Sequence, residues 1–362
     1  MRGRSKSPPE HRGPTIHDVA HAAGVSTATV SNVLRGTRYV GPEPKKKVQD
    51  AIAALNYRPN SLAAGLRERR SRTIGVVVPD ITMGLFPAIV RRLAARAACT
   101  DYQLILVDSQ EDLGWEQERV RALIRRSVDG LVVMPCRDDS PVLQDLRECR
   151  IPTVLLDRVA KGTDFDHVVA DNAAATREGT RHLIALGHRR ILLLANDPTL
   201  RNIQERVEGY REALQEAGLS AGENVLVAGR NEVDPARQAL AAVLAGPRRP
   251  SAVFALTQTM TIAALQAIGE VGLELPQDIS LLAFDDCAWF TALRPFISTL
   301  SQPTDDFADQ AWVMLMARLN EDRSPTQHSQ VSCRLVVRES TAPYRTPRAR
   351  EAVPVLETPS AR

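Results

Sequence analysis

Polar side chains recur on one face of a short segment near the start of the chain. The segment TIHDVAHAAGVSTATVSNVL, residues 15–34, has a small residue at Ala20, a turn residue at Gly24 and an apolar anchor at Val30. This spacing is typical of a helix-turn-helix, in which two helices cross at the small residue. The polar residues left on the outer face of the second helix are Thr27, Thr29, Ser31 and Asn32. Their donors and acceptors can contact base edges or phosphates, whereas a helical hairpin with a solvated face is the alternative.

A second set of polar residues follows the apolar runs in the rest of the chain. Its members are Asp80, Thr82, Asp108, Ser109, Gln110, Asp157, Arg158, Asn196, Asp285 and Asp286. In open parallel sheets, ligands bind beyond the carboxyl ends of the strands. Carboxylates, amides and an arginine suit a hydroxyl-rich small molecule, because both its donors and its acceptors must be satisfied. Ordinary polarity at strand ends is the alternative for any single residue.

Catalytic and metal-binding patterns are missing from the sequence. We find no G-x-S-x-G, G-x-x-x-x-G-K-[ST], G-x-G-x-x-G or H-E-x-x-H motif, and the 7 histidines have no metal-ligand spacing. The 5 cysteines are irregularly spaced, which predicts buried, reduced thiols. We therefore expect neither an enzyme nor a metal or cofactor. An enzyme on a doubly wound fold remains an alternative that a hydrolase assay would test.

The charge of the chain is concentrated at its N-terminal end. Residues 1–72 hold 14 lysines and arginines against 5 acidic residues, whereas the remainder holds 32 against 38. A basic end on a mildly acidic body favours contact with nucleic acid. No apolar run is long enough to cross a bilayer, and the basic start lacks the apolar stretch of a secretory signal. We expect a cytoplasmic protein without a membrane partner, although an exported solute-capture protein is a further alternative.

The elements that position these residues fall into distinct parts. Residues 15–57 predict three short helices, the first capped by Thr15 with Asp18 and the second by Ser26, with Val30, Val33 and Leu34 facing inward. From residue 73 onward, nine apolar runs alternate with helical stretches, which indicates parallel sheets covered on both faces. Nine strands exceed one ordinary sheet of roughly five or six, so we expect two lobes.

We predict the following domain boundaries: a disordered basic tail at 1–14, the helix-turn-helix at 15–59, a hinge and linker at 60–72, and a two-lobed ligand-binding and dimerisation domain at 73–342. The N-lobe is expected at about 73–171 and 301–330, the C-lobe at about 172–300 and 331–342, and a disordered tail at 343–362. The predicted fold class is α/β, with a three-helix headpiece and a two-lobed, doubly wound parallel-sheet sensor, which resembles the fold of periplasmic binding proteins.

Ordered matches along the chain identify a family. The segments TIHDVAHAAGVSTATVSNVL, VQDAIAALNYRPNSLAAGL, IGVVVPD, LIALGHRRI, ERVEGYREAL, PQDISLLAFDD and PFISTLSQP resemble the lac repressor/gal repressor family over residues 15–340. The resemblance implies a transcription regulator, most simply a repressor. It also implies a palindromic operator bound by a homodimer, because two symmetric headpieces meet two half-sites.

The resemblance sharpens the DNA-binding residues. It implies that Thr27, Ala28 and Asn32 discriminate operator sequence, and that Leu66 of a hinge helix at 60–66 wedges into the minor groove. Ala64 and Lys45 replace arginines that the family usually has. The predicted DNA-binding set is Thr15, Ser26, Thr27, Ala28, Thr29, Ser31, Asn32, Tyr57, Asn60 and Leu66.

The resemblance also implies a small effector, a sugar or sugar derivative, between the lobes. Arg206 matches a ligand-binding arginine and Asp285 an aspartate that accepts sugar hydroxyls. Thr257 and Gln258 replace the Asn-Asp pair of many members, which puts the effector's identity in doubt. The predicted ligand-binding set is Phe86, Asp157, Arg206, Thr257, Asp285 and Trp289. Effector binding would shift the population between lobe arrangements. A protein co-regulator docking on the first lobe is the remaining alternative.

Overall fold

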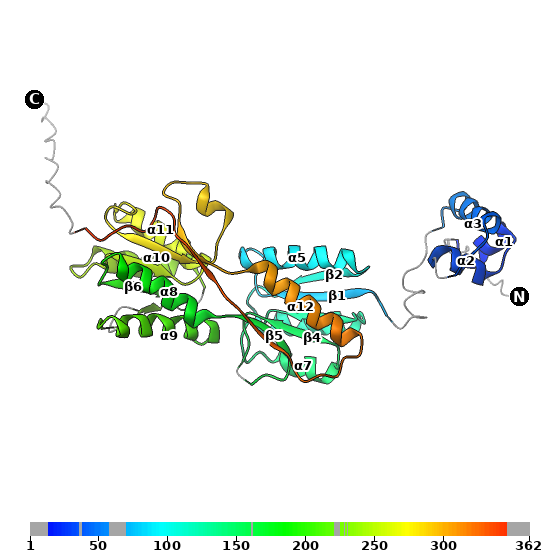
Figure 1. Cartoon of the computed structure of the whole chain (residues 1–362), viewed down its shortest axis with the longest axis horizontal. Helices are drawn as coiled ribbons and strands as arrows, with labels where there is room; N and C mark the ends of the chain where they lie inside the picture. Colours follow the sequence, from blue (N-terminus) through cyan, green and yellow to red (C-terminus); the bar gives the residue numbers. More distant parts are fainter. Residues whose placement is uncertain are drawn as a thin grey trace, which may run out of the picture. The chain divides into compact units, whose positions relative to one another are not determined.

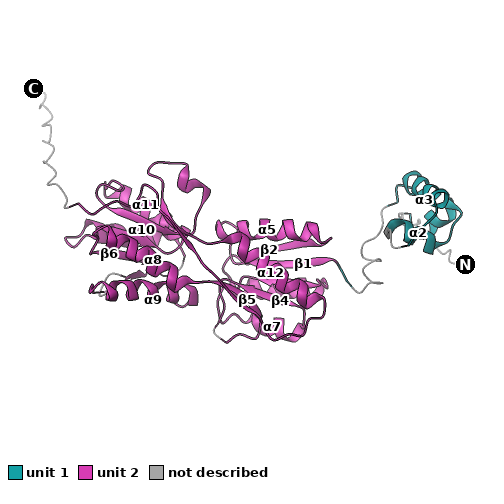
Figure 2. Ribbon diagram, in the orientation of Figure 1, with its two compact units in different colours: residues 1–71 teal, residues 72–362 magenta. Residues whose placement is uncertain are grey.

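The structure, a computed structural model, describes residues 14–35, 38–57, 70–160, 162–220, 225–227, 229 and 231–345. Contacts within the chain divide it into two compact units, residues 1–71 and residues 72–362 (Figure 2). Residues 1–13, 58–69 and 346–362 lie outside the described residues. These ranges hold all but Pro14 of the predicted tail at 1–14, the whole predicted hinge helix at 60–66 and most of the predicted tail at 343–362.

The first unit is a headpiece of three helices. They are α1 (Ile16–Ala23), α2 (Thr27–Arg35) and α3 (Pro42–Ala54). The predicted capping box at Thr15 and Asp18 is confirmed, and Gly24 ends α1 in the left-handed region with a φ of 65°. The prediction that Leu34 faces inward is wrong, because α3 packs mainly against α1 and leaves the last turn of α2 uncovered.

The second unit contains two six-stranded sheets. The N-lobe sheet has the order β11–β5–β4–β3–β1–β2 and is parallel throughout. Its strands are β1 (Thr73–Val78), β2 (Gln103–Asp108), β3 (Gly130–Val133), β4 (Thr153–Leu156), β5 (Asp166–Ala170) and β11 (His328–Val331). In this sheet the strand order reverses at β1, which is where open α/β sheets bind ligands.

The C-lobe sheet repeats this arrangement with the order β12–β10–β9–β8–β6–β7. Its strands are β6 (Ile191–Ala195), β7 (Val225–Val227), β8 (Ala252–Ala255), β9 (Ser280–Phe284), β10 (Ser298–Ser301) and β12 (Arg334–Val336). Only β12 runs antiparallel to its neighbour. All nine predicted strands form, and β10, β11 and β12 are additional. The predicted α/β fold class is confirmed.

Helices cover both faces of each sheet (Figure 1). In the N-lobe, α5 (Leu85–Cys99) and α12 (Thr304–Leu319) pack on one face, and α6 (Leu113–Arg125) and α7 (Val142–Cys149) pack on the other. In the C-lobe, α8 (Asn172–Ala185) and α9 (Arg201–Glu216) cover one face, and α10 (Val233–Ala245) and α11 (Gln258–Glu270) cover the other. Strands buried on both faces explain the continuous apolar runs of the sequence.

The chain passes between the lobes three times: from β5 to α8, from β10 to α12 and from β11 to β12. The first and third passages are joined directly, because the backbone N–H of Asp171 donates to the carbonyl of Val331 at 2.9 Å. Gln302 lies on the second passage and is buried. Adjacent crossings give the two lobes a common hinge.

Several chemical expectations can be compared with the described residues. All five cysteines are free, as predicted, but Cys99 is exposed and only Cys136 is fully buried, so the prediction of buried thiols is wrong for Cys99. Cys99 is the last residue of α5, at a helix end that the core does not cover. Within the described ranges, no helix is both long and apolar enough to cross a membrane. Among the same residues, no group of three or more histidine, cysteine or acidic side chains could hold a metal ion.

Candidate functional site

The predicted DNA-binding residues of the headpiece cluster at two helix starts and on the outer side of α2. Thr15 and Ser26 cap α1 and α2; the backbone N–H of Thr29 donates to the Ser26 hydroxyl at 3.1 Å. The hydroxyls of Ser26 and Thr29 lie 2.9 Å apart. These caps fix the helix starts, and contact of the three residues with DNA stays a prediction.

The outer side of α2 carries the remaining candidates. Ala28 is exposed, and Thr27, Ser31 and Asn32 are half-buried, whereas Val30 on the inner side is fully buried. A polar face with a methyl group at its centre can contact base edges in a major groove. Tyr57 packs against the headpiece core, and Asn60 and Leu66 lie outside the described residues.

Tyr39 is an aromatic residue that was not predicted from the sequence. Its side chain is 92% exposed, between α2 and α3 of the basic headpiece. Tyrosine hydroxyls are among the groups that hydrogen-bond DNA phosphates, so Tyr39 is a further candidate for DNA contact. The signal in the sequence was a tyrosine beside Arg38, in a segment without apolar periodicity.

Five of the six predicted ligand-binding residues line one enclosed space between the two lobes. The N-lobe contributes Phe86 and Asp157, and the C-lobe contributes Arg206, Thr257 and Asp285. The cavity volume is only about 20 Å³, so the lobes are closed upon each other. A ligand of the size of a sugar requires the lobes to separate before it can enter.

Trp289 does not belong to this cavity. It lies in the 3₁₀ turn Ala288–Thr291 and packs against the C-lobe core, edge-on to Phe290 with ring centroids 4.5 Å apart. The structure therefore brings together five predicted residues and leaves Trp289 apart from them.

Arg206 is held rigidly at the cavity. It is buried, its Nε donates to Asn172 Oδ1 at 2.9 Å, and one terminal nitrogen donates to the carbonyl of Leu256 at 2.6 Å. Its guanidinium carbon lies 3.5 Å from the centroid of the Phe284 ring, a cation–π contact. Contacts with three different elements fix the guanidinium plane before any ligand arrives.

Two aspartates approach the cavity from left-handed backbone positions. Asp157 follows β4 with a φ of 65°, and Asp285 follows β9 with a φ of 72°. Non-glycine residues in this region are uncommon and concentrate at functional sites. Burial raises the pKa of the Asp285 carboxyl, although the charge of Arg206 and a hydrogen bond from Gln302 oppose that effect. The Asp285 carboxylate is thus held ready to accept further hydrogen bonds.

Thr257 and Gln258 occupy the start of α11. The Thr257 hydroxyl caps that helix and donates to Asn231 Oδ1 at 3.1 Å. Gln258 reaches the other lobe, where its Oε1 accepts from the backbone N–H of Gly84 at 2.8 Å. Gln258, which replaces a residue of the family's Asn-Asp pair, therefore links the two lobes.

Further cavity residues lay outside the predicted ligand-binding set. Gln302 donates from Nε2 to Asp285 Oδ1 at 2.6 Å, and Asn202 lies 3.3 Å from an oxygen of Asp157. Asn196 also lines the cavity. Gln302 falls within the PFISTLSQP segment, whose family resemblance could have indicated it. Its pairing with Asp285 is visible only in the structure, because the two residues are 17 positions apart in the sequence.

A wider space lies next to the enclosed cavity. Its volume is about 570 Å³, and it shares Arg158, Asn196 and Leu200 with the cavity. Residues 110–114, Cys136 and Arg137 of the N-lobe and Asp197, Asn231 and Glu232 of the C-lobe form the rest of its wall. We call this space, which lies beside the enclosed cavity, the vestibule.

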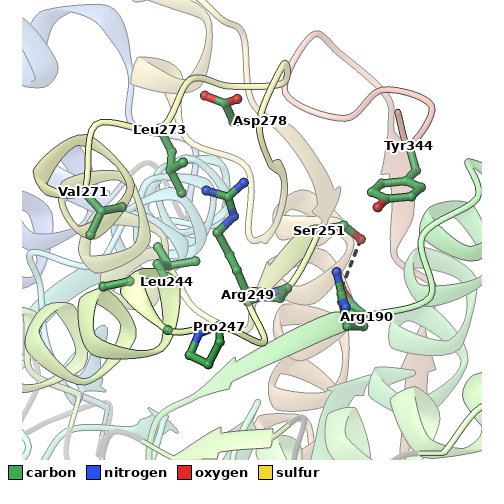
Figure 3. A pocket seen from close by; sticks show the side chains of 12 residues that line it. Arg190, Leu244, Pro247, Arg249, Ser251, Val271, Leu273, Asp278 and Tyr344 are labelled. Atoms are coloured by element: carbon green, nitrogen blue, oxygen red, sulfur yellow. Dashed lines mark hydrogen bonds between the residues drawn. The ribbon is translucent and has the colours of Figure 1, made fainter. Parts of the chain in front are cut away.

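Another pocket lies at the opposite edge of the C-lobe sheet (Figure 3). Arg190 and Ser251, which precede β6 and β8, contribute to it, and the Arg249 side chain extends between Leu244 and Asp278. None of the predicted site residues lines it. Because parallel sheets bind ligands at the carboxyl ends of their strands, we assign the functional site to the interlobe cavity.

A helix-turn-helix unit in the same chain as a two-lobed unit of the binding-protein type defines a class of ligand-responsive DNA-binding regulators. Comparison with known families agrees with both units: residues 15–60 match the lacI family of bacterial regulatory proteins, and residues 180–341 match a periplasmic binding protein-like domain. The chain belongs to the lac repressor family and is a DNA-binding transcriptional repressor. The predicted family and the prediction that the chain is not an enzyme are confirmed.

Individual relatives cover nearly the whole chain. The transcriptional repressor PurR of Escherichia coli is 34% identical over 336 residues, which is 91% of this chain and 98% of PurR. A lac repressor dimer bound to operator and the anti-inducer ONPF is 26% identical, with a TM-score of 0.82 over 91% of this chain and 100% of that chain. The regulator CelR in complex with cellobiose is 29% identical, with a TM-score of 0.69 over 90% of this chain and 99% of that chain.

Proposed function

We propose that this repressor binds a palindromic operator as a homodimer, and that a small polar molecule between the lobes controls its affinity for that operator. The proposed effector is a sugar or sugar derivative. The observation that carries the proposal is the convergence of Phe86, Asp157, Arg206, Thr257 and Asp285, from both lobes, on one buried cavity. A ligand that contacts both lobes has different affinities for their open and closed arrangements, which is the requirement for a population shift.

The DNA side of the proposal is supported by the headpiece. Ala28 and the polar residues around it lie on the outer side of α2, and Lys45 and Lys46 add exposed positive charge on α3. The lac repressor structure is of a dimer on its operator, which supports the same assembly for this chain. Leu66 as a minor-groove wedge and the domain boundaries given above remain part of the proposal. A protein that acts on the chromosome works in the cytoplasm.

The effector side is supported by the arrangement of polar groups. Asp285 and Gln302 form an acceptor-rich pair beside the rigid guanidinium of Arg206. Phe86 contributes an apolar wall, and its ring is 1% exposed. An apolar wall with a few fixed polar groups is typical of small-molecule sites. CelR binds cellobiose in its solved complex, which favours a carbohydrate here.

Selection from random duplex DNA by the purified full-length protein tests the proposal. We expect an enriched palindrome whose half-sites match the two headpieces of a dimer. Candidate effectors are then titrated against this operator. Retention of DNA without sequence enrichment, lost on raising the salt concentration, would show phosphate binding only and would contradict specific repression.

A further inference from the structure

Unpartnered buried atoms concentrate at the junction of the two lobes. Among the described residues, six buried side-chain nitrogen or oxygen atoms have no hydrogen-bond partner, and four of these belong to the junction: Asp138 Oδ1, Arg158 Nε, Asn196 Oδ1 and Gln302 Oε1. Three of the four are acceptors and one is a donor. Buried polar groups are normally satisfied, so these atoms indicate the polarity of the missing partner.

The acceptor character of Gln302 is fixed by its other contact. Its Nε2 donates to the Asp285 carboxylate, which can only accept, so the unpartnered atom is the carbonyl oxygen. Gln302 is 5% exposed and Asn196 is 2% exposed, and both line the cavity. The carboxylates of Asp157 and Asp285 add further acceptors, and the charge of Asp157 disfavours that of Asp285. The buried atoms without a partner at the cavity are therefore mostly acceptors, and two carboxylates lie beside them.

Both arginines at the cavity donate hydrogen bonds to the protein itself, and the second terminal nitrogen of Arg206 remains as a donor at the cavity. Arg206 donates to Asn172 and to a backbone carbonyl, as described above. Arg158 donates from both terminal nitrogens to the Glu111 carboxylate, and also to the carbonyl of Cys136. A phosphate group binds where charged donors are free. Among the described residues, Arg158 Nε is the one fully buried arginine nitrogen without a partner.

The vestibule has the same polarity as the cavity. Its charged lining residues are Glu111, Asp112, Asp197 and Glu232 against Arg137 and Arg158. The excess of carboxylates in the vestibule repels anions and lowers their local concentration beside the cavity. The vestibule and the cavity thus both disfavour a negatively charged ligand.

We infer that the effector is a donor-rich molecule without negative charge, and that phosphorylated or carboxylated molecules are rejected by this site. The inference rests on the proposed function of the interlobe cavity. Hydroxyl or N–H groups would meet the oxygens of Asn196, Gln302 and Asp285, whereas a phosphate would bring a further negative charge beside the carboxylates of Asp157 and Asp285.

The test can be made before the effector is identified. A small-molecule extract of the host bacterium is separated on a strong anion exchanger into an unretained and a retained fraction. Each fraction is added to the full-length protein on its selected operator, and operator affinity is measured. We expect the unretained fraction alone to change the affinity. Activity in the retained fraction would overturn the inference. If neither fraction acts while operator binding is intact, control by a cleft ligand fails, and the proposed function fails with it.

Variants at Asn196 connect the result to the cavity. Asn196→Ala removes an acceptor, and we expect the response to the unretained fraction to need at least about tenfold more extract. Asn196→Lys supplies a cation at the same point, and we expect it to gain a response to the retained fraction. Operator binding without extract shows that each variant folds. Unchanged sensitivity in the alanine variant would overturn the role of the unpartnered oxygen.

Matched compounds give a second readout by calorimetry. The probes are glucose against glucose 6-phosphate, ribose against ribose 5-phosphate, and adenosine against its monophosphate. For any pair in which binding is detected, we expect the phosphorylated member to bind at least about tenfold more weakly, because it loses donors and adds repulsion. Equal or tighter binding of the phosphorylated member would overturn the inference.

Discussion

Asp138 of the N-lobe accepts a hydrogen bond of 2.6 Å from the backbone N–H of Arg201, the first residue of α9 in the C-lobe. The reverse contact is also present, because Gln258 of the C-lobe accepts from Gly84 at the start of α5 in the N-lobe. Each lobe thus supplies an oxygen to a helix N-terminus in the other. Burial raises the pKa of the Asp138 carboxyl, and the N–H of Arg201 at the positive end of the α9 dipole opposes that effect. These contacts exist only while the lobes are closed.

The first prediction follows from this reciprocal contact. Asp138→Ala removes an acceptor whose hydrogen bond is worth about 1.5–3 kcal/mol, so the ratio of closed to open molecules should fall by roughly tenfold or more. Energy transfer between a dye on the exposed Cys99 and a dye on Arg248→Cys in the C-lobe measures lobe separation. Asp139→Ala is the control, because Asp139 is exposed and pairs only with its neighbour Arg137. Equal energy transfer in both variants would show that the hydrogen bond between Asp138 and Arg201 does not hold the lobes closed.

A second prediction concerns the buried carboxylate of Asp285. Asp285→Asn preserves the left-handed backbone, which asparagine tolerates, and its amide oxygen can still accept from Gln302. Because burial raises the pKa of Asp285, the ionised form costs stability in the folded protein. We expect the variant to be more stable without ligand at neutral pH by on the order of 1–3 kcal/mol, and to lose its effector response. Thermal or urea unfolding measures the first effect.

A third prediction concerns how the stability difference between the wild type and Asp285→Asn depends on pH. Folding raises the pKa of the Asp285 carboxyl, so ionisation of this group destabilises the folded protein. This cost is absent below the unfolded pKa and reaches its full size as the pH rises through the folded pKa. The stability advantage of Asp285→Asn should therefore grow from acid toward neutral pH and vanish where the wild-type carboxyl is protonated. Unfolding free energies at a series of pH values test this. A difference independent of pH would show that packing, not ionisation, separates the two proteins.

The sequence predicted those strands whose burial leaves a continuous run of apolar residues. The nine apolar runs became strands because strands buried on both faces need continuous apolar residues. The strands β10, β11 and β12 were missed because segments such as STLS and HSQV are short and polar, and their pairing depends on distant partners. Leu34 was misplaced because helical periodicity does not show where the neighbouring helix ends.

The site was predictable in its individual residues and not in their pairing. Arg206 and Asp285 could be placed through family resemblance, and Asp157 through its position after a strand. Trp289 was assigned on its chemistry, but it packs against the C-lobe core and does not line the cavity. The contacts of Asp138 and Gln258 were not foreseen, because each joins a side chain to a backbone N–H of the other lobe. Contacts of this kind leave no pattern in a sequence.

A fourth prediction concerns the exposed Tyr39. Tyr39→Ala should leave the stability of the headpiece unchanged, since the side chain is 92% exposed, and should weaken operator binding by about two- to tenfold through a lost contact. Tyr39→Phe separates the hydroxyl from the ring. Fluorescence anisotropy at several salt concentrations gives a further distinction. Lys45→Ala should reduce the salt slope by about one, whereas Tyr39→Ala should leave the slope unchanged because tyrosine is neutral.

The last prediction concerns the close packing that positions Arg206. Gly209 follows Arg206 by three residues on α9, and a Cβ atom built on it would lie 2.1 Å from the carbonyl oxygen of Ala173 on α8. Backbone atoms cannot move aside as a flexible side chain can. Gly209→Ala should therefore destabilise the protein by about 1–3 kcal/mol, the usual cost of overpacking, and weaken the effector response by displacing α9.

Gly269→Ala is the matched control, because Gly269 also lies in a helix and has no atom within 4 Å of its added Cβ. An alanine there should be neutral or stabilise the protein by up to about 1 kcal/mol through helix propensity. Urea unfolding of the two variants and the wild type measures the difference. Equal stabilities for Gly209→Ala and Gly269→Ala would mean that α8 and α9 tolerate separation, and that their contact does not fix Arg206 at the cavity.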